Sequence, residues 1–192
     1  RDHKKLGKEL DLFTFSELVG SGLPLWTPKG TILRQELDTY VWELRSQYGY
    51  QRVTIPHITK RSLYETSGHW QHYKEDMFLL EVEGQTYALK PMNCPEGMLV
   101  YSSRLRSYKD LPLRLSEIGS LHRNELSGVL AGLFRVRQIT MDDAHIFCAP
   151  EHIEKEINSV LVLVKDFYRM FGFEPHFFLA TRPDDYMGEA KL

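Results

Sequence analysis

Residues 113–147 read LRLSEIGSLHRNELSGVLAGLFRVRQITMDDAHIF and form two extended runs joined by a glycine-containing loop. The return run begins at Leu133. Because side chains alternate between the two faces of a strand, its odd-numbered positions place two arginines, Asp143 and His145 on one face. Its even-numbered positions are mostly apolar. The pattern predicts a hairpin with one face on a core and a polar face suited to an anionic ligand.

The outgoing run ends in Arg123 and Glu125, which share a face, so pairing of the two runs would bring three arginines and two acids over one sheet. Alternating charges on a strand often mean only a solvated face. However, Asp143 and His145 lie in an otherwise apolar run that ends at residues 146–147. Charged groups in such a run cost stability unless they serve a site. From spacing alone, a solvated face and a functional site both stay open.

Length and composition favour one globular domain, or a large part of one. The chain has 192 residues, 42% of them hydrophobic, which is enough for a substantial core. The formal net charge of -2 means that any nucleic-acid contact depends on a local patch. No apolar run approaches the ~20 residues of a membrane span. Two cysteines make no disulfide framework, so a reducing cytosol is the simple assumption.

The spacing of apolar residues, prolines and glycines predicts the remaining elements. They are a helix over 31–48 with Thr31 as N-cap and Gly49 as its stop, a strand over 50–55, a hairpin over 77–89, a helix with Cys94 as N-cap, a long helix from Pro150 and a strand over 175–180. The apolar stripe of the long helix is assigned to the core. This order predicts an α+β domain, an antiparallel β-sheet flanked by helices.

Three residues invite a metal interpretation. His69 and His72 are three apart on a predicted helix and could share a ligand, although surface histidines beside a buried Trp70 are the simpler interpretation. Cys94, at a helix start, is expected to have a lowered pKa and to make a good thiolate ligand. Cys148 is interpreted as a small buried hydrophobe. No glycine-rich phosphate loop occurs, so phosphate binding would fall to arginines.

Four segments carry a resemblance to a known family: TSGHWQHYKEDMF (66–78), KPMNCP (90–95), HRNE (122–125) and DDAHIF (142–147). In this order they resemble the catalytic core of class II aminoacyl-tRNA synthetases, most closely the threonine-specific branch, up to about residue 183. The resemblance implies ATP-dependent activation of threonine to threonyl-adenylate and transfer to the 3′ end of tRNA(Thr). It also implies a cytoplasmic homodimer that uses no membrane.

The resemblance assigns nucleotide-site roles to five residues. Arg123 would hold the α-phosphate of ATP and the threonine carboxylate, and Glu125 would meet the adenine amino group. Arg135 would hold the γ-phosphate, with Mg²⁺ accompanying the ATP. Ile139 would form the wall against adenine, and His69 would assist transfer to the terminal ribose of the tRNA.

The amino-acid site follows from the same resemblance. Asp143 would accept a hydrogen bond from the threonine hydroxyl, with Met92 and Met141 beside the substrate. Cys94 and His145 would be two of three protein ligands of a zinc ion, and the third would lie beyond residue 192. A zinc ion with an open position separates threonine from valine, which lacks the second ligand atom.

The chain also departs from the family pattern. Ile139 stands where many members have Phe, Met141 where many have Gln, and Glu96-Gly97 where Gly-His is common. An aliphatic wall stacks adenine more weakly than an aromatic one. Residues 1–192 are expected to be a single partial catalytic domain that stops before the third signature, so we expect weak zinc binding and little or no activation by it alone.

Two alternatives belong to other classes. The first is a non-catalytic, synthetase-like module that binds tRNA or dimerises. The second is a purely structural zinc site, and the lack of a CxxC pair is evidence against it.

Overall fold

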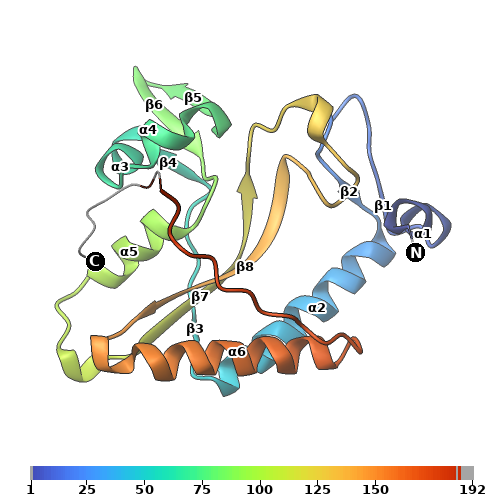
Figure 1. The fold of residues 1–192 in the computed structure, drawn as a ribbon. Coiled ribbons are helices and arrows are strands. Elements are labelled where there is room, and N and C mark those ends of the chain that lie inside the picture. Colours follow the sequence, from blue (N-terminus) through green and yellow to red (C-terminus); the bar gives the residue numbers. More distant parts are fainter. Residues whose placement is uncertain (1, 185, 187–192) are drawn as a thin grey trace.

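A computed structural model describes residues 2–184 and 186. Its strands form a central three-stranded sheet, a smaller three-stranded sheet and a two-stranded ribbon (Figure 1). The strands are β1 (Phe13–Thr14), β2 (Leu25–Trp26), β3 (Gln51–Arg52), β4 (Ile58–Lys60), β5 (Leu79–Val82), β6 (Gln85–Leu89), β7 (Leu113–His122) and β8 (Gln138–Phe147).

Helix α5 lies on one side of the central sheet, and α2 and α6 lie on the other (Figure 1). The helices are α1 (His3–Glu9), α2 (Pro28–Gln47), α3 (Arg61–Thr66), α4 (His69–Tyr73), α5 (Cys94–Ser102) and α6 (Ile153–Arg169). Short 3₁₀ turns are η1 (Lys74–Asp76), η2 (Tyr108–Asp110), η3 (Ser127–Val129) and η4 (Pro150–His152). Of the helices in the described ranges, none combines the length and the hydrophobicity that a bilayer span needs.

The central sheet confirms the predicted hairpin and the α+β class. β7 and β8 pair antiparallel over their whole length, from Leu113 opposite Phe147 to His122 opposite Gln138. The strand order is β3-β7-β8, and β3 runs parallel to β7. The parallel pairing of β3 is the exception to the predicted antiparallel sheet, and of the strand predicted over 50–55 only Gln51–Arg52 belongs to the sheet.

The two faces of this hairpin meet different helices. On the odd-numbered face, Glu117 and Asp143 bond to residues of the segment that leads into α5. On the even-numbered face, Arg114 forms two 2.6 Å hydrogen bonds to Glu156 of α6, and Ser116 accepts one from Arg45 of α2. The hairpin thus separates α5 from α2 and α6, as Figure 1 shows.

The even-numbered face is less apolar than predicted. Thr140 accepts a hydrogen bond from Arg34, and Asp142 forms an ion pair with Arg45 at 2.9 Å. The predicted, mostly apolar packing face thus also carries Asp142, which pairs with a basic residue. Helix α2 brings arginines to this side of the sheet, and they compensate polar strand residues.

The arginines that were placed on the strands lie instead in the connecting loop. β7 ends at His122 and β8 begins at Gln138, so residues 123–137 are not part of the sheet. The main-chain N–H groups of Arg137 and Gln138 donate to the Gly22 carbonyl, and the Arg137 carbonyl accepts from Arg123 N–H, so the ladder ends beside residues 20–22. Arg123, Glu125 and Arg135 therefore sit beyond the sheet end.

Helix α2 begins three residues earlier than predicted. Its N-cap is Thr27, not Thr31, and the Thr27 hydroxyl accepts a hydrogen bond from Gly30 N–H. Pro28 then occupies the first turn, where its missing N–H costs nothing. The predicted stop is confirmed, because Gly49 has a φ of 76° just after the C-cap.

Helix α6 opens with η4 and then packs on α2. Tyr40 stacks on Phe167 with ring centroids 5.7 Å apart, and the Tyr48 hydroxyl donates to Asp166. Two of its stripe residues, Ile153 and Ile157, are nevertheless about half exposed, at 49% and 56%. Tyr168 and Phe171 are also exposed, each at 40%, so the assignment of the whole stripe to the core is wrong at both ends of the helix.

Two further predictions concern strands. The hairpin of β5 and β6 is confirmed, and its two-residue turn has positive φ at Glu83 (51°) and Gly84 (74°). The strand predicted over 175–180 is not observed, and these residues pair with no strand of the described chain.

A buried ion pair joins the two sheets. The Lys90 side chain is fully buried, and its Nζ lies 3.2 Å from Glu117 Oε2. The other carboxylate oxygen of Glu117 accepts a hydrogen bond of 3.1 Å from Ile55 N–H. Lys90 follows β6 and Glu117 lies on β7, so the pair fixes the small sheet against the central one.

Lys90→Met leaves the Glu117 carboxylate buried without its cation. We expect it to lower the free energy of unfolding by about 3–5 kcal/mol in urea titrations. Lys90→Met combined with Glu117→Leu should recover much of that loss, because no uncompensated charge remains. The exposed Lys155→Met is the control, and an equal loss in Lys90→Met and Lys155→Met would contradict the assignment.

Candidate metal and amino-acid site

The start of α5 meets the odd-numbered face of β8 in a cluster of potential metal ligands. Cys94, Asp143 and His145 each offer one ligand atom, and these atoms all lie within 4.8 Å of one another. In residues 2–184 and 186, this is the one group of three or more such side chains. Asp143 and His145 converge because they are two apart on a strand. The predicted approach of Cys94 to His145 is therefore observed, and Asp143 takes the third corner.

Helix α5 starts one residue earlier than predicted. Asn93 is the N-cap and Cys94 is the first helical residue. The side chain of Asn93 is buried and makes no capping hydrogen bond. Its Nδ2 instead donates to Asp143 Oδ2 at 3.1 Å. No role was predicted for Asn93 from the sequence, although it directly precedes Cys94.

Asp143 is fixed by three interactions. Its Oδ1 accepts a hydrogen bond of 2.8 Å from Ala144 N–H, and its Oδ2 accepts the one from Asn93. Its main-chain carbonyl accepts a 3.1 Å hydrogen bond from Arg45 of α2, which reaches through from the other face of the sheet. Arg45 was also missed, because nothing in the periodicity of a helix marks a buried arginine.

The Glu96-Gly97 departure has a structural account. A Cβ at Gly97 would lie 3.1 Å from His145 Nδ1, so the glycine makes room for the imidazole ring. Glu96 is buried, and one of its oxygens accepts hydrogen bonds from the hydroxyls of Thr59 and Tyr64. This carboxylate therefore anchors the first turn of α5 to the small sheet.

The thiol of Cys94 departs from expectation. Burial raises the pKa of Cys94, and the nearby Asp143 carboxylate raises it further. The predicted lowering of this pKa is wrong, because desolvation and a like charge outweigh the helix start. The apo thiol is therefore protonated near neutral pH, and a metal ion that binds the thiolate must displace a proton.

The predicted phosphate-binding residues lie at the mouth of the loop that joins β7 to β8. Arg123 donates from Nε to the Pro91 carbonyl at 3.2 Å, which links it to the segment that leads to Cys94. Glu125 forms an ion pair with Arg135 at 3.0 Å, and the Arg135 side chain is 56% exposed. The three residues are thus close in the fold but bonded to protein groups.

The other predicted residues fall in two places. Ile139 and Met141 are half-buried on β8, and Met92 is half-buried just before the cluster. His69 lies on α4 near the small sheet, with Nδ1 2.8 Å from Ser67 Oγ, and takes no part in the cluster. His72 is exposed, whereas His69 and Trp70 are half-buried, so the expected burial of Trp70 is only partial.

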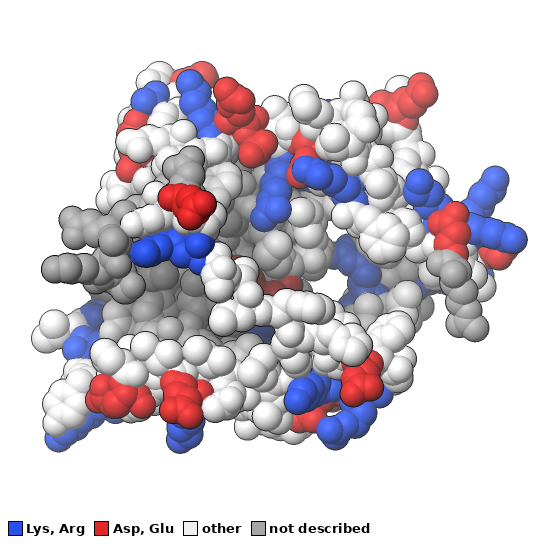
Figure 2. Space-filling model, in the orientation of Figure 1, with Lys and Arg blue, Asp and Glu red and all other residues white. Residues whose placement is uncertain are grey.

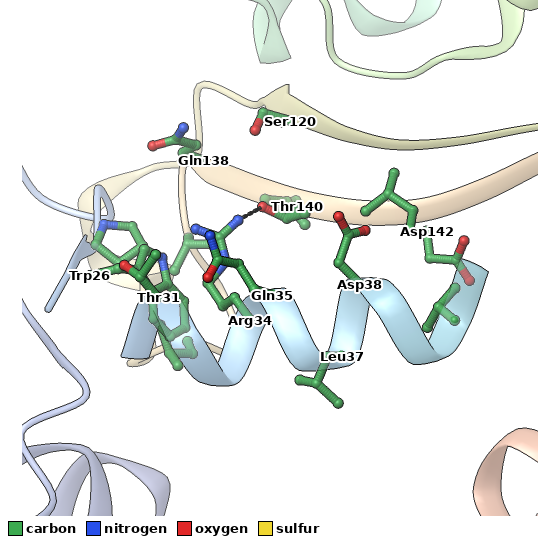
Figure 3. Close-up of a pocket in the computed structure, with 16 residues that line it drawn as sticks. Trp26, Thr31, Arg34, Gln35, Leu37, Asp38, Ser120, Gln138, Thr140 and Asp142 are labelled. Carbon is green, nitrogen blue, oxygen red and sulfur yellow. Dashed lines mark hydrogen bonds between the residues drawn. The ribbon is translucent and has the colours of Figure 1, made fainter. Parts of the chain in front are cut away.

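A separate cavity of about 730 Å³ lies on the opposite side of the sheet, between α2 and β8. Figure 3 shows Arg34, Gln35 and Asp38 of α2 facing the strands, with Arg34 bonded to Thr140. Of the predicted site residues, Ile139 alone is among its lining. The cavity is therefore distinct from the Cys94 cluster.

The face of the molecule shown in Figure 2 has no large patch of one charge sign. Figure 2 shows basic and acidic side chains intermixed among the residues that it colours. This agrees with the formal net charge of -2.

Comparison with known proteins identifies the same segment. Residues 78–189 match the family model described as tRNA synthetase class II core domain (G, H, P, S and T). The curated threonine–tRNA ligase of Caldanaerobacter subterraneus subsp. tengcongensis is 56% identical over 188 residues, which are 98% of this chain and 29% of that protein. That of Carboxydothermus hydrogenoformans is 52% identical over 192 residues, 100% of this chain and 30% of that protein. The chain thus spans less than a third of the length of these relatives.

Solved structures agree in fold. The RNA binding domain of threonyl-tRNA synthetase from Cryptosporidium parvum Iowa II has a TM-score of 0.94 at 41% identity, covering 100% of this chain and 48% of that one. A putative threonyl-tRNA synthetase from Aeropyrum pernix has a TM-score of 0.86 at 31% identity, covering 91% and 41%. Giardia lamblia prolyl-tRNA synthetase, at 21% identity and a TM-score of 0.77 over 86% and 34% of the two chains, shares the fold.

The raised pKa of Cys94 predicts slow alkylation. In a Cys148→Ser background, the iodoacetamide rate should rise with pH around a midpoint above the value of about 8.5 for a free cysteine. Mass spectrometry of the modified peptide measures the rate, and Cys94→Ser in the same background is the blank. A midpoint below that of free cysteine would mean that the helix start dominates after all.

Proposed function

The chain belongs to the class II tRNA synthetase core-domain family, and we propose that it is part of the catalytic domain of a threonine–tRNA ligase. The observation that carries the proposal is the cluster of Cys94, Asp143 and His145 in a chain of this family. The reaction proposed for the intact protein is activation of threonine with ATP, followed by transfer to the 3′ end of tRNA(Thr).

We propose that Cys94 and His145 hold a zinc ion. Sulfur and imidazole nitrogen are ligands that zinc prefers, and bonds of about 2.0–2.3 Å require ligand atoms roughly 3.5 Å apart, so separations within 4.8 Å need little adjustment. The bound ion would supply a Lewis acid with open positions for the substrate amine and hydroxyl. Asp143 would accept the hydroxyl proton in a hydrogen bond, with Met92 and Met141 closing the pocket.

Specificity follows from the hydroxyl. An apolar pocket separates threonine from valine by only about 10²-fold, whereas a site that bonds the hydroxyl reaches roughly 10⁴–10⁵. Because Asp143 is fixed by Asn93, Ala144 and Arg45, its carboxylate is held ready for that bond. Serine also offers a hydroxyl, so this site would not exclude it.

The nucleotide would lie beside the loop that joins β7 to β8, where Arg123 and Arg135 are. The threonine carboxylate attacks the α-phosphorus, and the bond to pyrophosphate breaks. Negative charge grows on phosphate oxygens, so Arg123 at the α-phosphate and Arg135 at the γ-phosphate would stabilise the transition state together with Mg²⁺. Glu125 would take the adenine amino group and Ile139 its ring. Arg135 must then exchange its bond to Glu125 for the phosphate.

The remaining proposals concern partners. Helix α2 exposes Ile32, Leu33 and Leu37, at 58%, 46% and 37%, which supports a homodimer through this helix. His69 would face the 3′ end of tRNA(Thr) during transfer. Residues 1–192 would form one partial catalytic domain that works in the cytoplasm.

Zinc and threonine binding test the pocket directly. With Co²⁺ in place of zinc, we expect thiolate absorption that is lost in Cys94→Ser and in His145→Ala. Threonine should change the spectrum and valine should not, and Asp143→Ala should abolish the difference. A wild-type spectrum that responds equally to both amino acids would reject hydroxyl-based selection.

Pyrophosphate exchange tests catalysis. We expect threonine-dependent exchange by this 192-residue chain to be at least ~10²-fold below that of a full-length threonine–tRNA ligase. The third signature of the family is expected beyond residue 192, and loss of a single transition-state donor costs about that much. Arg123→Ala should remove any residual rate. An exchange rate equal to that of the full-length enzyme would refute the expectation that this chain alone activates threonine poorly. Metal and threonine binding with no exchange, even in a C-terminally extended chain, would favour the non-catalytic alternative.

A further inference from the structure

Asn93 is a helix cap whose side chain does not cap. Asparagine is favoured at N-caps because its oxygen accepts an N–H of the first turn. In this chain Asn93 occupies the N-cap of α5, yet its side chain makes no capping hydrogen bond. It is 2% exposed, so its amide points into the protein toward the strand that carries Asp143.

Of the two polar atoms of this amide, the nitrogen makes a hydrogen bond and the oxygen does not. Nδ2 donates to Asp143 Oδ2 at 3.1 Å. The opposite amide orientation would set two acceptor oxygens against each other, so the orientation is determined by the carboxylate. In the described part of the chain, no donor reaches Asn93 Oδ1, which is buried. A buried acceptor without a partner is costly, and such an atom in a native site requires an explanation.

The position of Oδ1 indicates what could pair with it. Both amide heteroatoms share one carbon, so Oδ1 lies beside the same carboxylate that Nδ2 contacts. The next residue, Cys94, belongs to the metal cluster with Asp143 and His145. A ligand that fills the space beside that cluster would therefore approach Asn93 Oδ1, which solvent does not reach in the ligand-free chain. Only a hydrogen-bond donor can satisfy a carbonyl oxygen.

We propose that Asn93 is a further specificity-determining residue of the amino-acid pocket, with Nδ2 holding Asp143 and Oδ1 accepting a hydrogen bond from the α-amino group of the bound amino acid. This inference rests on the proposed function. Asp143 takes the ligand hydroxyl in that proposal, and an amine that binds the ion through its lone pair keeps its N–H groups as the remaining donors. Asn93 and Asp143 together then read the two polar substituents that distinguish a 2-amino-3-hydroxy acid.

The bonds of the segment before Asn93 hold this residue in a fixed position. Lys90 is fixed by its buried ion pair with Glu117, and the Pro91 carbonyl accepts a hydrogen bond from Arg123. The Asn93 carbonyl accepts one from Gly97 N–H within α5. A side chain held on both sides loses little freedom when a ligand binds, which favours affinity.

The test compares ligands and variants on the zinc- or Co²⁺-loaded chain by isothermal titration and by absorption. Asn93→Leu removes both amide functions at similar volume, and Asn93→Asp keeps an acceptor but loses the donor. We expect Asn93→Leu to weaken threonine binding by about 10- to 100-fold, while the Co²⁺ spectrum of the ligand-free site is retained. Asn158→Leu, on the exposed side of α6, is the matched control and should bind as the wild type does.

A ligand without the amine isolates the direct contact. 3-Hydroxybutyrate keeps the hydroxyl and the carboxylate, so Asn93→Leu should weaken its binding clearly less than that of threonine. Equal losses for both ligands would mean that Asn93 acts only through Asp143, and would overturn the contact. Wild-type affinity in Asn93→Leu would overturn the inference and leave the proposed function standing. Wild-type protein that binds neither metal nor threonine would overturn both.

Discussion

The buried ion pair between Lys90 and Glu117 is the constraint on which the site depends. Glu117 lies directly opposite Asp143 in the β7–β8 ladder, so two carboxylates share one face of the sheet. Like charges placed opposite each other on a sheet are destabilising. The fully buried ammonium of Lys90 compensates one of them and draws the chain that follows β6 down onto this face. Three residues later that chain supplies Asn93 and then the thiol of Cys94.

Much of this could be read from the sequence, because strand periodicity is local. A spacing of two puts Asp143 and His145 on one face whatever the rest of the fold does. The hairpin of β7 and β8 follows from two extended runs around glycines, and the stop of α2 at Gly49 follows from the positive φ that a helix end requires. The β5–β6 turn at Glu83 and Gly84 is equally local. These features depend on a few neighbouring residues.

What the sequence could not predict depends on contacts between distant segments. Residues 133–137 continue the extended pattern, yet the Gly22 carbonyl accepts the N–H groups of Arg137 and Gln138 where β8 begins, and nothing near residue 135 signals this. Burial of Cys94 and the approach of Asp143 likewise reverse the pKa expected at a helix start. The apparent strand over 175–180 shows the same limit, since a strand exists only with a neighbour.

Arg45 links helix α2 to both strands of the hairpin. Its guanidinium bridges Asp142, Ser116 and the carbonyl of Asp143, while its own helix presents apolar side chains outward. Through these bonds one side chain of α2 contacts both strands of the hairpin and the main chain at Asp143. The helix and the cluster of Cys94, Asp143 and His145 therefore share a support, although they lie on opposite faces of the sheet.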